Sequence, residues 1–253
     1  MSYTRKERAV RSAMLFSDAK LDVLWHSHVM IFGLGGVGSY AAEALCRAGI
    51  GRLTLVDADV VAVSNLNRQL PALCSTIGRP KAEVVRERLL DIAPDAQIEA
   101  VQAFHLPDFP VPIPDSTAFV VDAVDTVAAK LDLAETCMRR EIPLVSCMGM
   151  GNRLDPTKIH IGDVFKTTDC PLCRVMRREL RRREISALRC VYSTEKARES
   201  IGEGSADKRQ TGRSVPGSVA YVPAVAGLYM AYETVRRLCE DGTIIETERK
   251  ALD

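Results

Sequence analysis

The sequence contains a glycine turn of the kind that cradles phosphate groups. The stretch VMIFGLGGVGSYAAEAL (29–45) places Gly33, Gly35 and Gly38 between a strand-like run and the start of a helical pattern. Gly33 permits a tight bend, Gly35 lets the backbone approach a phosphate, and Gly38 lets the helix pack closely on the strand. A helix starting near Gly36 directs its amide groups at an anion. The turn predicts phosphate binding, and by itself it suits NAD or FAD as well as ATP.

A polar loop follows the next strand-like run, RLTLVD. Asp57 ends that run about 20 residues after the turn, where a ribose-binding acid is expected. The segment DADVVAVSNLNRQ (57–69) then adds further polar candidates for nucleotide binding. They are Asp59, Ser64, Asn65, Asn67, Arg68 and Gln69.

Three more candidates occur later in the same half of the chain. Lys81 opens a helical segment, and Asp125 and Thr126 follow the run TAFVVDA (117–123), at the sheet edge that borders the ligand crevice in open α/β folds. Arg68 can fork onto phosphate oxygens, Lys81 can act as a point charge, and Asp125 can hold Mg²⁺. Taken singly, Lys81 also fits a solvated lysine and Arg68 a surface ion pair. Their joint spacing favours ATP with Mg²⁺ over a dinucleotide.

Alternating strand and helix patterns would position these groups. Strands are expected at 28–32, 52–57, 96–101, 117–123 and 142–147, with helices at 38–49, 79–93 and 127–140. A strand at 157–164, a helix at 171–184, a strand at 188–193 and a helix near 222–239 follow. This order predicts an α/β fold: a doubly wound, mostly parallel Rossmann-like sheet with helices on both faces and an elaborated C-terminal half.

We expect a single domain over residues 1–253. A helical lead-in (1–28) carries a loose apolar stripe of Met14, Leu15, Leu21 and Leu24. An ATP-binding half (29–150) precedes a C-terminal half (151–253). Within the latter, 195–218 has few apolar residues and many Gly, Ser and charged residues, which predicts a mobile loop.

Four motifs, GLGGVG, DADVVAVSNLNRQ, Lys81 and DAVDT, occur in one order over residues 11–150. In that order they closely resemble the ubiquitin-activating, ThiF/MoeB/HesA superfamily of adenylating enzymes. The resemblance implies a role for each matching residue: Gly35 and Gly36 line the ATP loop, Asp57 binds ribose, Asn65 and Arg68 contact phosphates, Lys81 binds the β/γ-phosphates and Asp125 binds Mg²⁺. It also implies that an N-terminal arginine, matched best by Arg11, reaches the ATP of a partner subunit. The implied catalytic set is Arg11, Arg68, Lys81 and Asp125.

The cysteine pattern bears on which branch of the superfamily this is. Members that activate sulfur carriers generally have two C-x-x-C pairs that bind zinc, and four thiolates at that spacing are a strong indication. This chain has one pair, Cys170 and Cys173, while Cys190 and Cys239 stand alone. Zinc and a carrier-activating role are therefore disfavoured. Cys147, at a predicted strand end, fits a buried core thiol better than a catalytic one.

The segment after Cys173 is strongly basic. Arg174, Arg177, Arg178, Arg181 and Arg182 recur with helical spacing and share one face. On a protein with a net charge of +1, this face predicts a local footprint for the phosphate backbone of a nucleic acid. The alternative is a solvated helix face paired with Glu179 and Glu184.

Three further stretches resemble a narrower branch, the TcdA subfamily of tRNA threonylcarbamoyladenosine dehydratases. They are GMGNRLDPTKIHIGDVFKTTDCPLCRVMRRELRR (149–182), CVYSTE (190–195) and GSVAYVPAVAGLYMA (217–231). The resemblance implies a homodimer that uses ATP to adenylate the carboxylate of threonylcarbamoyladenosine beside the anticodon, and then cyclises it by dehydration. In some members it implies a sulfur-transfer partner.

Composition sets the limits of these hypotheses. Hydrophobic residues at 47% and charged residues at 26% are ordinary for a soluble globular protein. We expect a cytoplasmic protein without a membrane segment, because residues 1–20 have no apolar run and the apolar stretch 219–232 is too short to span a bilayer. Two alternatives stay open: adenylation of a ubiquitin-like sulfur carrier, and a non-catalytic ATP- and tRNA-binding protein.

Overall fold

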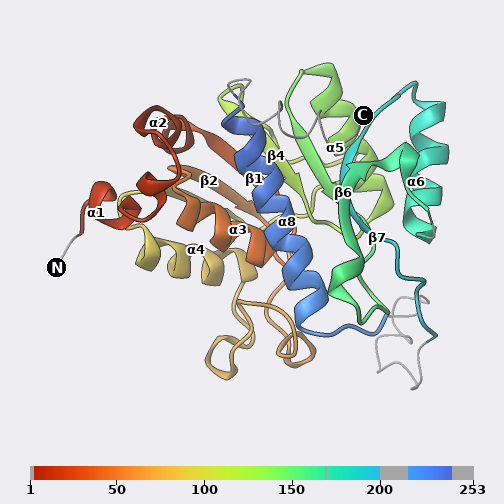
Figure 1. Cartoon of the computed structure of the whole chain (residues 1–253). Helices are drawn as coiled ribbons and strands as arrows, with labels where there is room; N and C mark the ends of the chain where they lie inside the picture. Colours follow the sequence, from red (N-terminus) through yellow and green to blue (C-terminus); the bar gives the residue numbers. More distant parts are fainter. Residues whose placement is uncertain (1–2, 169, 200–215, 241–253) are drawn as a thin grey trace.

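A computed structural model describes residues 3–168, 170–199 and 216–240, and its centre is a seven-stranded sheet (Figure 1). The strands are β1 (His28–Phe32), β2 (Arg52–Val56), β3 (Gln97–Val101), β4 (Thr117–Asp122), β5 (Leu144–Cys147), β6 (Ile159–Asp163) and β7 (Arg189–Ser193). Their spatial order is β3-β2-β1-β4-β5-β7-β6, and all neighbours run parallel except β6 against β7. The chain order reverses between β1 and β4, where ligands bind in open α/β sheets. The predicted fold class is confirmed.

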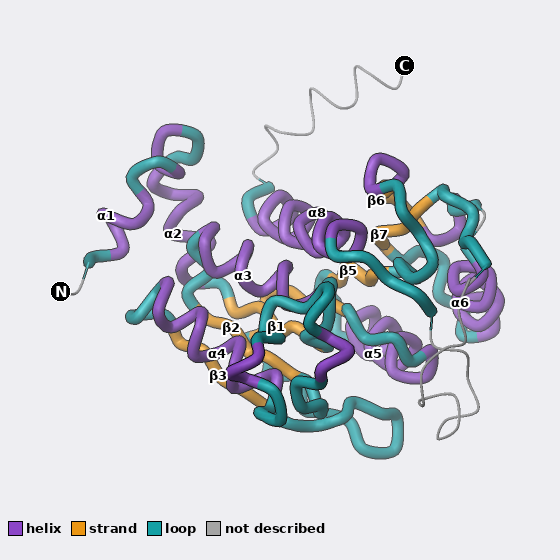
Figure 2. The backbone as a smooth tube through the Cα atoms, turned by 90° about the horizontal axis from the view of Figure 1, so that it is seen from below, coloured by secondary structure: helices purple, strands orange, loops and turns teal. Residues whose placement is uncertain are grey.

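Helices cover both faces of this sheet. They are α3 (Gly38–Ala48), α4 (Lys81–Ile92), α5 (Val127–Arg139), α6 (Pro171–Arg182) and α8 (Tyr221–Leu238). Figure 2 shows α3 and α8 on one side of the strands and α5 on the other. Helix α4 shares the core of the first side, and α6 packs with α5 on the second.

The central strand shows why both faces must be covered. Every residue of β1 is buried. Val29 and Ile31 belong to the core under α3 and α8, whereas Met30 and Phe32 belong to the core under α5. Successive side chains of a strand point to opposite faces, so a fully apolar strand needs a packed layer on each side.

The N-terminal lead-in differs in part from the prediction. Helices α1 (Arg5–Ala9) and α2 (Asp18–His26) are separated by a short 3₁₀ turn. Leu21 and Leu24 are buried as expected, but Met14 and Leu15 are 71% and 87% exposed. The expected continuous stripe is wrong at these two positions. The 3₁₀ turn and a new helix start, capped by the Ser17 side chain, break the helical period between the two pairs.

The remaining differences lie in element boundaries. The strand predicted at 157–164 starts at Ile159, because Pro156–Lys158 forms a 3₁₀ turn. Of the loop predicted at 195–218, residues 200–215 lie outside the described residues, and its described ends have no helix or strand. Among the described helices, none is long and apolar enough to cross a bilayer.

Candidate nucleotide site and basic helix

The glycine turn after β1 is built so tightly that two of its positions require glycine. Gly33 has a φ of +86°, and a Cβ there would lie 2.7 Å from the carbonyl oxygen of Ala123. A Cβ on Gly38 would lie 1.8 Å from the carbonyl oxygen of Gly33. The amide of Gly33 also donates to the carbonyl of Val56 at 2.8 Å. The turn is therefore fixed to the ends of both neighbouring strands.

Asp57 fastens this turn to the end of β2. Its carboxylate accepts hydrogen bonds from the backbone amides of Leu34 (2.6 Å) and Asp59 (2.8 Å). Burial raises the pKa of Asp57, while the charge of Lys81 and these two amides act in the opposite direction. The structure thus gives Asp57 a role in shaping the turn, and the ribose contact stays a prediction.

Lys81 is a buried lysine at the first position of α4. Its side chain is 6% exposed, and Nζ donates to Oδ2 of Asp59 at 2.7 Å. The Asp59 side chain is 57% exposed and lies between this ammonium group and solvent-accessible space. A second bond, from the Lys81 amide to the Asp59 carbonyl at 3.0 Å, holds the two residues in register. Burying the alkyl stem fixes the charged end in place.

The polar loop 62–69 folds on itself beside the glycine turn. Asn65 is buried, and its side-chain oxygen accepts from the Ala62 amide at 3.0 Å. Nη1 of Arg68 donates to the Ser64 carbonyl (2.9 Å) and to the Asn67 side chain (2.8 Å). Asn67 in turn donates to the carbonyl of Ser218, just before α8, at 2.9 Å. The structure thus brings Ser64, Asn67 and Arg68 together, and Asn65 caps the loop. Their contacts to a nucleotide stay a prediction.

Gln69 lies directly over the turn. A Cβ on Gly35 would lie 3.7 Å from Nε2 of Gln69, and one on Gly36 would lie 3.4 Å from Cγ of Arg68. The Oε1 atom of Gln69 is buried and has no hydrogen-bond partner among the described residues. Buried polar atoms are nearly always paired, so this oxygen is suited to accept a bond from a ligand.

Asp125 and Thr126 follow β4 at the same sheet edge. Asp125 is exposed, and the Thr126 hydroxyl donates to its carboxylate at 3.3 Å. Beneath them lies a buried ion pair that the sequence analysis did not assign. Nζ of Lys130 lies 3.1 Å from both carboxylate oxygens of Asp122, and the Ser146 hydroxyl donates to Oδ2 at 2.5 Å.

The sequence does contain a trace of this pair. Lys130 has the helical spacing of Leu133, Ala134 and Cys137, all of which are buried in the structure. A lysine on the apolar face of a helix needs a buried counter-charge. In the structure Asp122, on the adjoining strand, supplies it.

Arg11 lies apart from this crevice in its own chain. It is exposed and precedes the 3₁₀ turn Ser12–Met14, in the segment between α1 and α2 at the left of Figure 1, whereas the loop after β2 lies at the bottom. Its neighbours Val10, Met14 and Leu15 are also exposed. No described contact joins Arg11 to the glycine turn.

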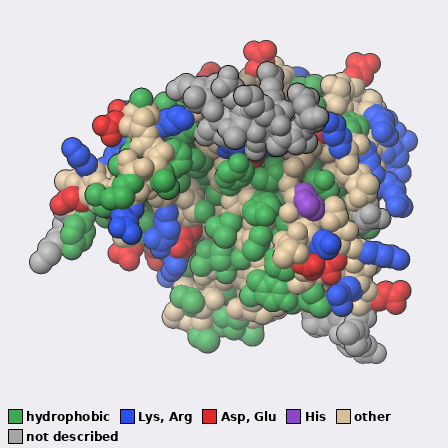
Figure 3. Space-filling view, in the orientation of Figure 1, with side chains coloured by type: hydrophobic (Ala, Val, Ile, Leu, Met, Phe, Trp, Pro, Cys, Tyr) green, Lys and Arg blue, Asp and Glu red, His purple; other side chains and the backbone are tan. Residues whose placement is uncertain are grey.

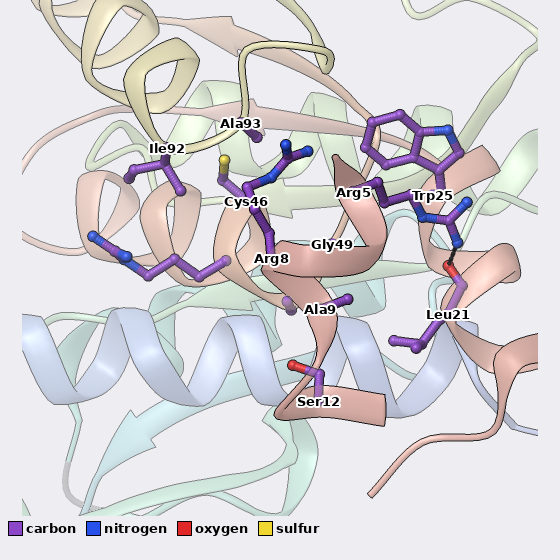
Figure 4. A pocket seen from close by; sticks show the side chains of 12 residues that line it. Arg5, Arg8, Ala9, Ser12, Leu21, Trp25, Cys46, Gly49, Ile92 and Ala93 are labelled. Carbon is purple, nitrogen blue, oxygen red and sulfur yellow. Dashed lines mark hydrogen bonds between the residues drawn. The ribbon is translucent and has the colours of Figure 1, made fainter. Parts of the chain in front are cut away.

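The same N-terminal region borders a cavity of about 330 Å³ (Figure 4). Arg5 stacks on the Trp25 ring at 5.0 Å and donates to Asp22 at 2.8 Å. Arg8 pairs with Asp95. Both guanidinium groups therefore already have carboxylate partners, and the Arg8–Asp95 pair joins the lead-in to the body of the protein.

Four of the five predicted arginines of α6 are exposed, and one has a structural role. Figure 3 shows Lys and Arg side chains gathered over α6 at the right edge of the molecule. Arg177 is half-buried and donates to the Thr167 carbonyl (2.9 Å) and hydroxyl (2.5 Å). The exposed set is Arg174, Arg178, Arg181 and Arg182. Within it, Arg178 and Arg182 bind Glu179 at 2.9 and 3.1 Å, as the alternative interpretation expected.

The thiols of the described chain are buried except that of Cys74. Cys170 and Cys173 lie at the first turn of α6 and Cys147 at the end of β5. Burial raises the pKa of Cys147 to about 12, so this thiol is protonated at neutral pH. Over residues 3–168, 170–199 and 216–240, no three His, Cys, Asp or Glu side chains are arranged to hold a metal ion.

Comparison with known proteins agrees with this geometry. The family model described as "ThiF family" matches residues 8–253. The tRNA threonylcarbamoyladenosine dehydratase of Bacillus subtilis (strain 168) is 38% identical over 240 residues, covering 91% of this chain and 94% of that protein. The protein of the same name from Escherichia coli (strain K12) is 38% identical over 199 residues, covering 75% and 74%.

Solved structures give the same result. The E. coli enzyme TcdA in complex with AMP superposes with a TM-score of 0.82 at 31% identity, covering 98% of this chain and 100% of that one. TcdA in complex with ATP gives a TM-score of 0.80 at 32% identity, covering 96% of each chain. The match to the family model and the high coverage of these relatives show that the chain belongs to the ThiF family.

Proposed function

We propose that this protein is an ATP-dependent tRNA threonylcarbamoyladenosine dehydratase. The observation that carries the proposal is the similarity, over nine-tenths of the chain, to a protein of that name. The crevice supports it independently, because it combines a phosphate-binding turn with a buried lysine and an exposed carboxylate at one sheet edge. The single sheet and the family match over residues 8–253 support the prediction of one domain.

The reaction has two steps. The threonyl carboxylate of the modified adenosine attacks the α-phosphate of ATP, which forms an acyl adenylate and releases pyrophosphate. A nitrogen or oxygen of the same modification then attacks the acyl carbon, and AMP leaves. The nucleoside loses one water in total, and the protein's contribution is to position the groups and stabilise the transferred charge.

Each part of the crevice has a matching role. The amides of the glycine turn face the phosphates. Lys81 can release its bond to Asp59 in favour of the β/γ-phosphates, because its burial keeps the ammonium group at the crevice. The unpartnered oxygen of Gln69 can accept a bond from the nucleotide, and Arg68 can exchange its bonds to Ser64 and Asn67 for bonds to phosphate oxygens.

Asp125 fits a magnesium ion bound together with ATP. Mg²⁺ takes one or two carboxylates and completes its shell with water and phosphate oxygens. Asp125 offers an exposed carboxylate whose hydrogen bond within the described chain comes from Thr126. The ion would neutralise charge on the phosphates, while Asp125 holds it at the edge of the sheet.

Arg11 fits a contribution to a partner's site. No described contact joins it to the crevice of its own chain, and Val10, Met14 and Leu15 expose apolar surface beside it. We therefore keep the homodimer as part of the proposal, with Arg11 of each subunit directed at the ATP of the other. The exposed arginines of α6 fit the tRNA backbone, and a sulfur-transfer partner remains a prediction.

One experiment tests the proposal directly. The protein is incubated with ATP, Mg²⁺ and tRNA carrying threonylcarbamoyladenosine. The tRNA is then digested, and the masses of its nucleosides are measured. We expect a product lighter by one water, with AMP and pyrophosphate released. ATP binding without pyrophosphate release would instead support the non-catalytic alternative. Pyrophosphate release only with a sulfur-carrier protein would support the carrier-adenylating one.

A further inference from the structure

The first turn of α6 presents two cysteines in a specific arrangement. Cys170 is the residue that caps the N-terminus of the helix, Pro171 is its first residue, and Cys173 is its third. Both sulfurs are buried, with residue exposures of 3% and 0%. A C-x-x-C pair at the start of a helix is the arrangement found in dithiol redox motifs.

The two sulfurs are in direct contact. The Cys173 thiol donates a hydrogen bond to the Cys170 sulfur, which also accepts from the backbone amides of Cys173 and Gly149. The bond from Cys173 lowers the pKa of Cys170; burial opposes this, and the two amides reinforce it. The same sulfur–sulfur bond raises the pKa of Cys173. The two pKa shifts run in opposite directions, which favours Cys170 over Cys173 as the thiol that ionises first.

A buried arginine adds positive charge at this site. Arg153 is 3% exposed and donates to the carbonyls of Gly149 and Glu195, and its Nη2 atom has no partner among the described residues. Arg153 and the Cys170 sulfur thus bind the same residue, Gly149, from its carbonyl and its amide. The guanidinium group also lowers the pKa of Cys170.

Two other buried thiols, those of Cys137 and Cys147, lack these features. Burial raises the pKa of both Cys137 and Cys147 to about 12. Neither has a sulfur partner that stabilises its anion. A structural zinc site, for its part, takes four ligands, and this pair supplies two.

We propose that Cys170 and Cys173 form a redox couple that interconverts between a dithiol and an intramolecular disulfide by exchange with small-molecule disulfides. The Cys170 thiolate attacks one sulfur of the disulfide RSSR, which forms a mixed disulfide and releases one thiolate RS⁻. Cys173 then loses its proton to solvent and attacks the Cys170 sulfur, which releases the second RS⁻. The two protein thiols are oxidised and RSSR is reduced to two RSH. Since hydrogen bonds stabilise the reduced form, we expect the disulfide to be readily reduced again.

The test is a redox titration of the full chain. Protein is equilibrated anaerobically with reduced and oxidised glutathione at a series of ratios, and incubated until the composition is constant because both sulfurs are buried. The sample is then quenched with acid, alkylated and digested, and the masses of the peptides are measured. The expected result is a peptide containing Cys170 and Cys173 that is lighter by two hydrogens, in a proportion that follows the buffer ratio and returns to zero with dithiothreitol.

Three variants locate the chemistry. Cys173→Ala is expected to trap glutathione on Cys170, and Cys170→Ala is expected to leave Cys173 with at least about tenfold less adduct, because a thiol of raised pKa attacks slowly. Cys74→Ser, at an exposed thiol, is the control and should leave the titration unchanged.

Two results would overturn the proposal. One is a pair that stays reduced at every ratio while Cys74 takes up glutathione. The other is stoichiometric zinc in the purified protein that is lost in both alanine variants. The wild-type titration alone shows whether the pair stays reduced at every ratio. The test therefore does not depend on whether Cys170→Ala and Cys173→Ala fold.

Discussion

The nucleotide half and the C-terminal half of this protein position their charged groups in different ways. Around the crevice, backbone geometry sets the site: Gly33 and Gly38 have no room for a Cβ, and Asp57 binds two backbone amides. In the C-terminal half, contacts between side chains position the charged groups. There Arg177 is bound to Thr167, and Glu233 of α8 lies between Arg189 and Arg236.

This difference decides how far local sequence is informative. A glycine demanded by a backbone contact has to appear as glycine, so the turn is visible in the sequence. An arginine on a helix looks the same whether it faces solvent or a threonine from another segment. The predictions below test this contrast, beginning with the largest expected effect.

The glycine turn offers the sharpest test. Gly38→Ala should lower the free energy of unfolding by about 4 kcal/mol or more, because its Cβ would overlap the Gly33 carbonyl and the backbone must move. Gly35→Ala is the matched control, since its Cβ would meet only Gln69, at 3.7 Å. We expect Gly35→Ala to keep the wild-type unfolding midpoint in urea and to lose ATP affinity. Equal stability losses in the two variants would contradict the assignment.

Much of the fold and part of the site could be predicted from the sequence. The seven strands could be predicted from short apolar runs between helical segments. The crevice could be predicted from motifs that each lie within a single loop. Lys130 was missed because its partner, Asp122, lies on another element, so that only the fold reveals the pair.

The division of the α6 arginines into exposed ones and a structural one also depended on tertiary structure. Arg177 has the same spacing as its neighbours, and only the position of Thr167 shows that it is used internally. Likewise, the sequence placed Met14 and Leu15 on the same apolar stripe as Leu21. In the structure both are exposed, because a 3₁₀ turn separates them from Leu21.

The buried pair beneath the crevice tests a side-chain contact within the nucleotide half. Lys130→Met should cost about 3–5 kcal/mol, because it leaves the buried Asp122 side chain without its counter-charge. Lys130→Met combined with Asp122→Asn should recover part of this loss, since the amide carbonyl can still accept from Ser146. Urea unfolding of both variants measures the difference. A double variant less stable than Lys130→Met alone would rule out the explanation based on unpaired charge.

Glu233 provides the equivalent test in the C-terminal half, with a dependence on pH. Burial opposes its ionisation, but hydrogen bonds from Arg236 and Arg189 outweigh this and lower its pKa below the ordinary 4.5. A lowered carboxyl pKa stabilises the fold above that value, and this stabilisation is lost as pH falls from about 4.5 through the pKa of the folded state. Glu233→Gln should therefore cost about 2–3 kcal/mol at pH 7, and the difference from wild type should shrink below pH 4.5. A difference that is constant with pH would show that the carboxylate charge is not responsible.

The smallest effects are expected on α6, where two adjacent arginines separate a structural role from a binding role. Arg177→Ser should cost about 1–2 kcal/mol of stability, because the Thr167 carbonyl loses its donor, while the salt dependence of tRNA binding changes little. Arg178→Ser should leave the unfolding midpoint unchanged and reduce the slope of log K against log salt by about one, the contribution of one phosphate contact. Filter binding of tRNA at several salt concentrations, together with urea unfolding, measures both quantities. If Arg177→Ser altered the slope and Arg178→Ser did not, the half-buried arginine would be the one that contacts RNA. The structural distinction between the two positions would then be wrong.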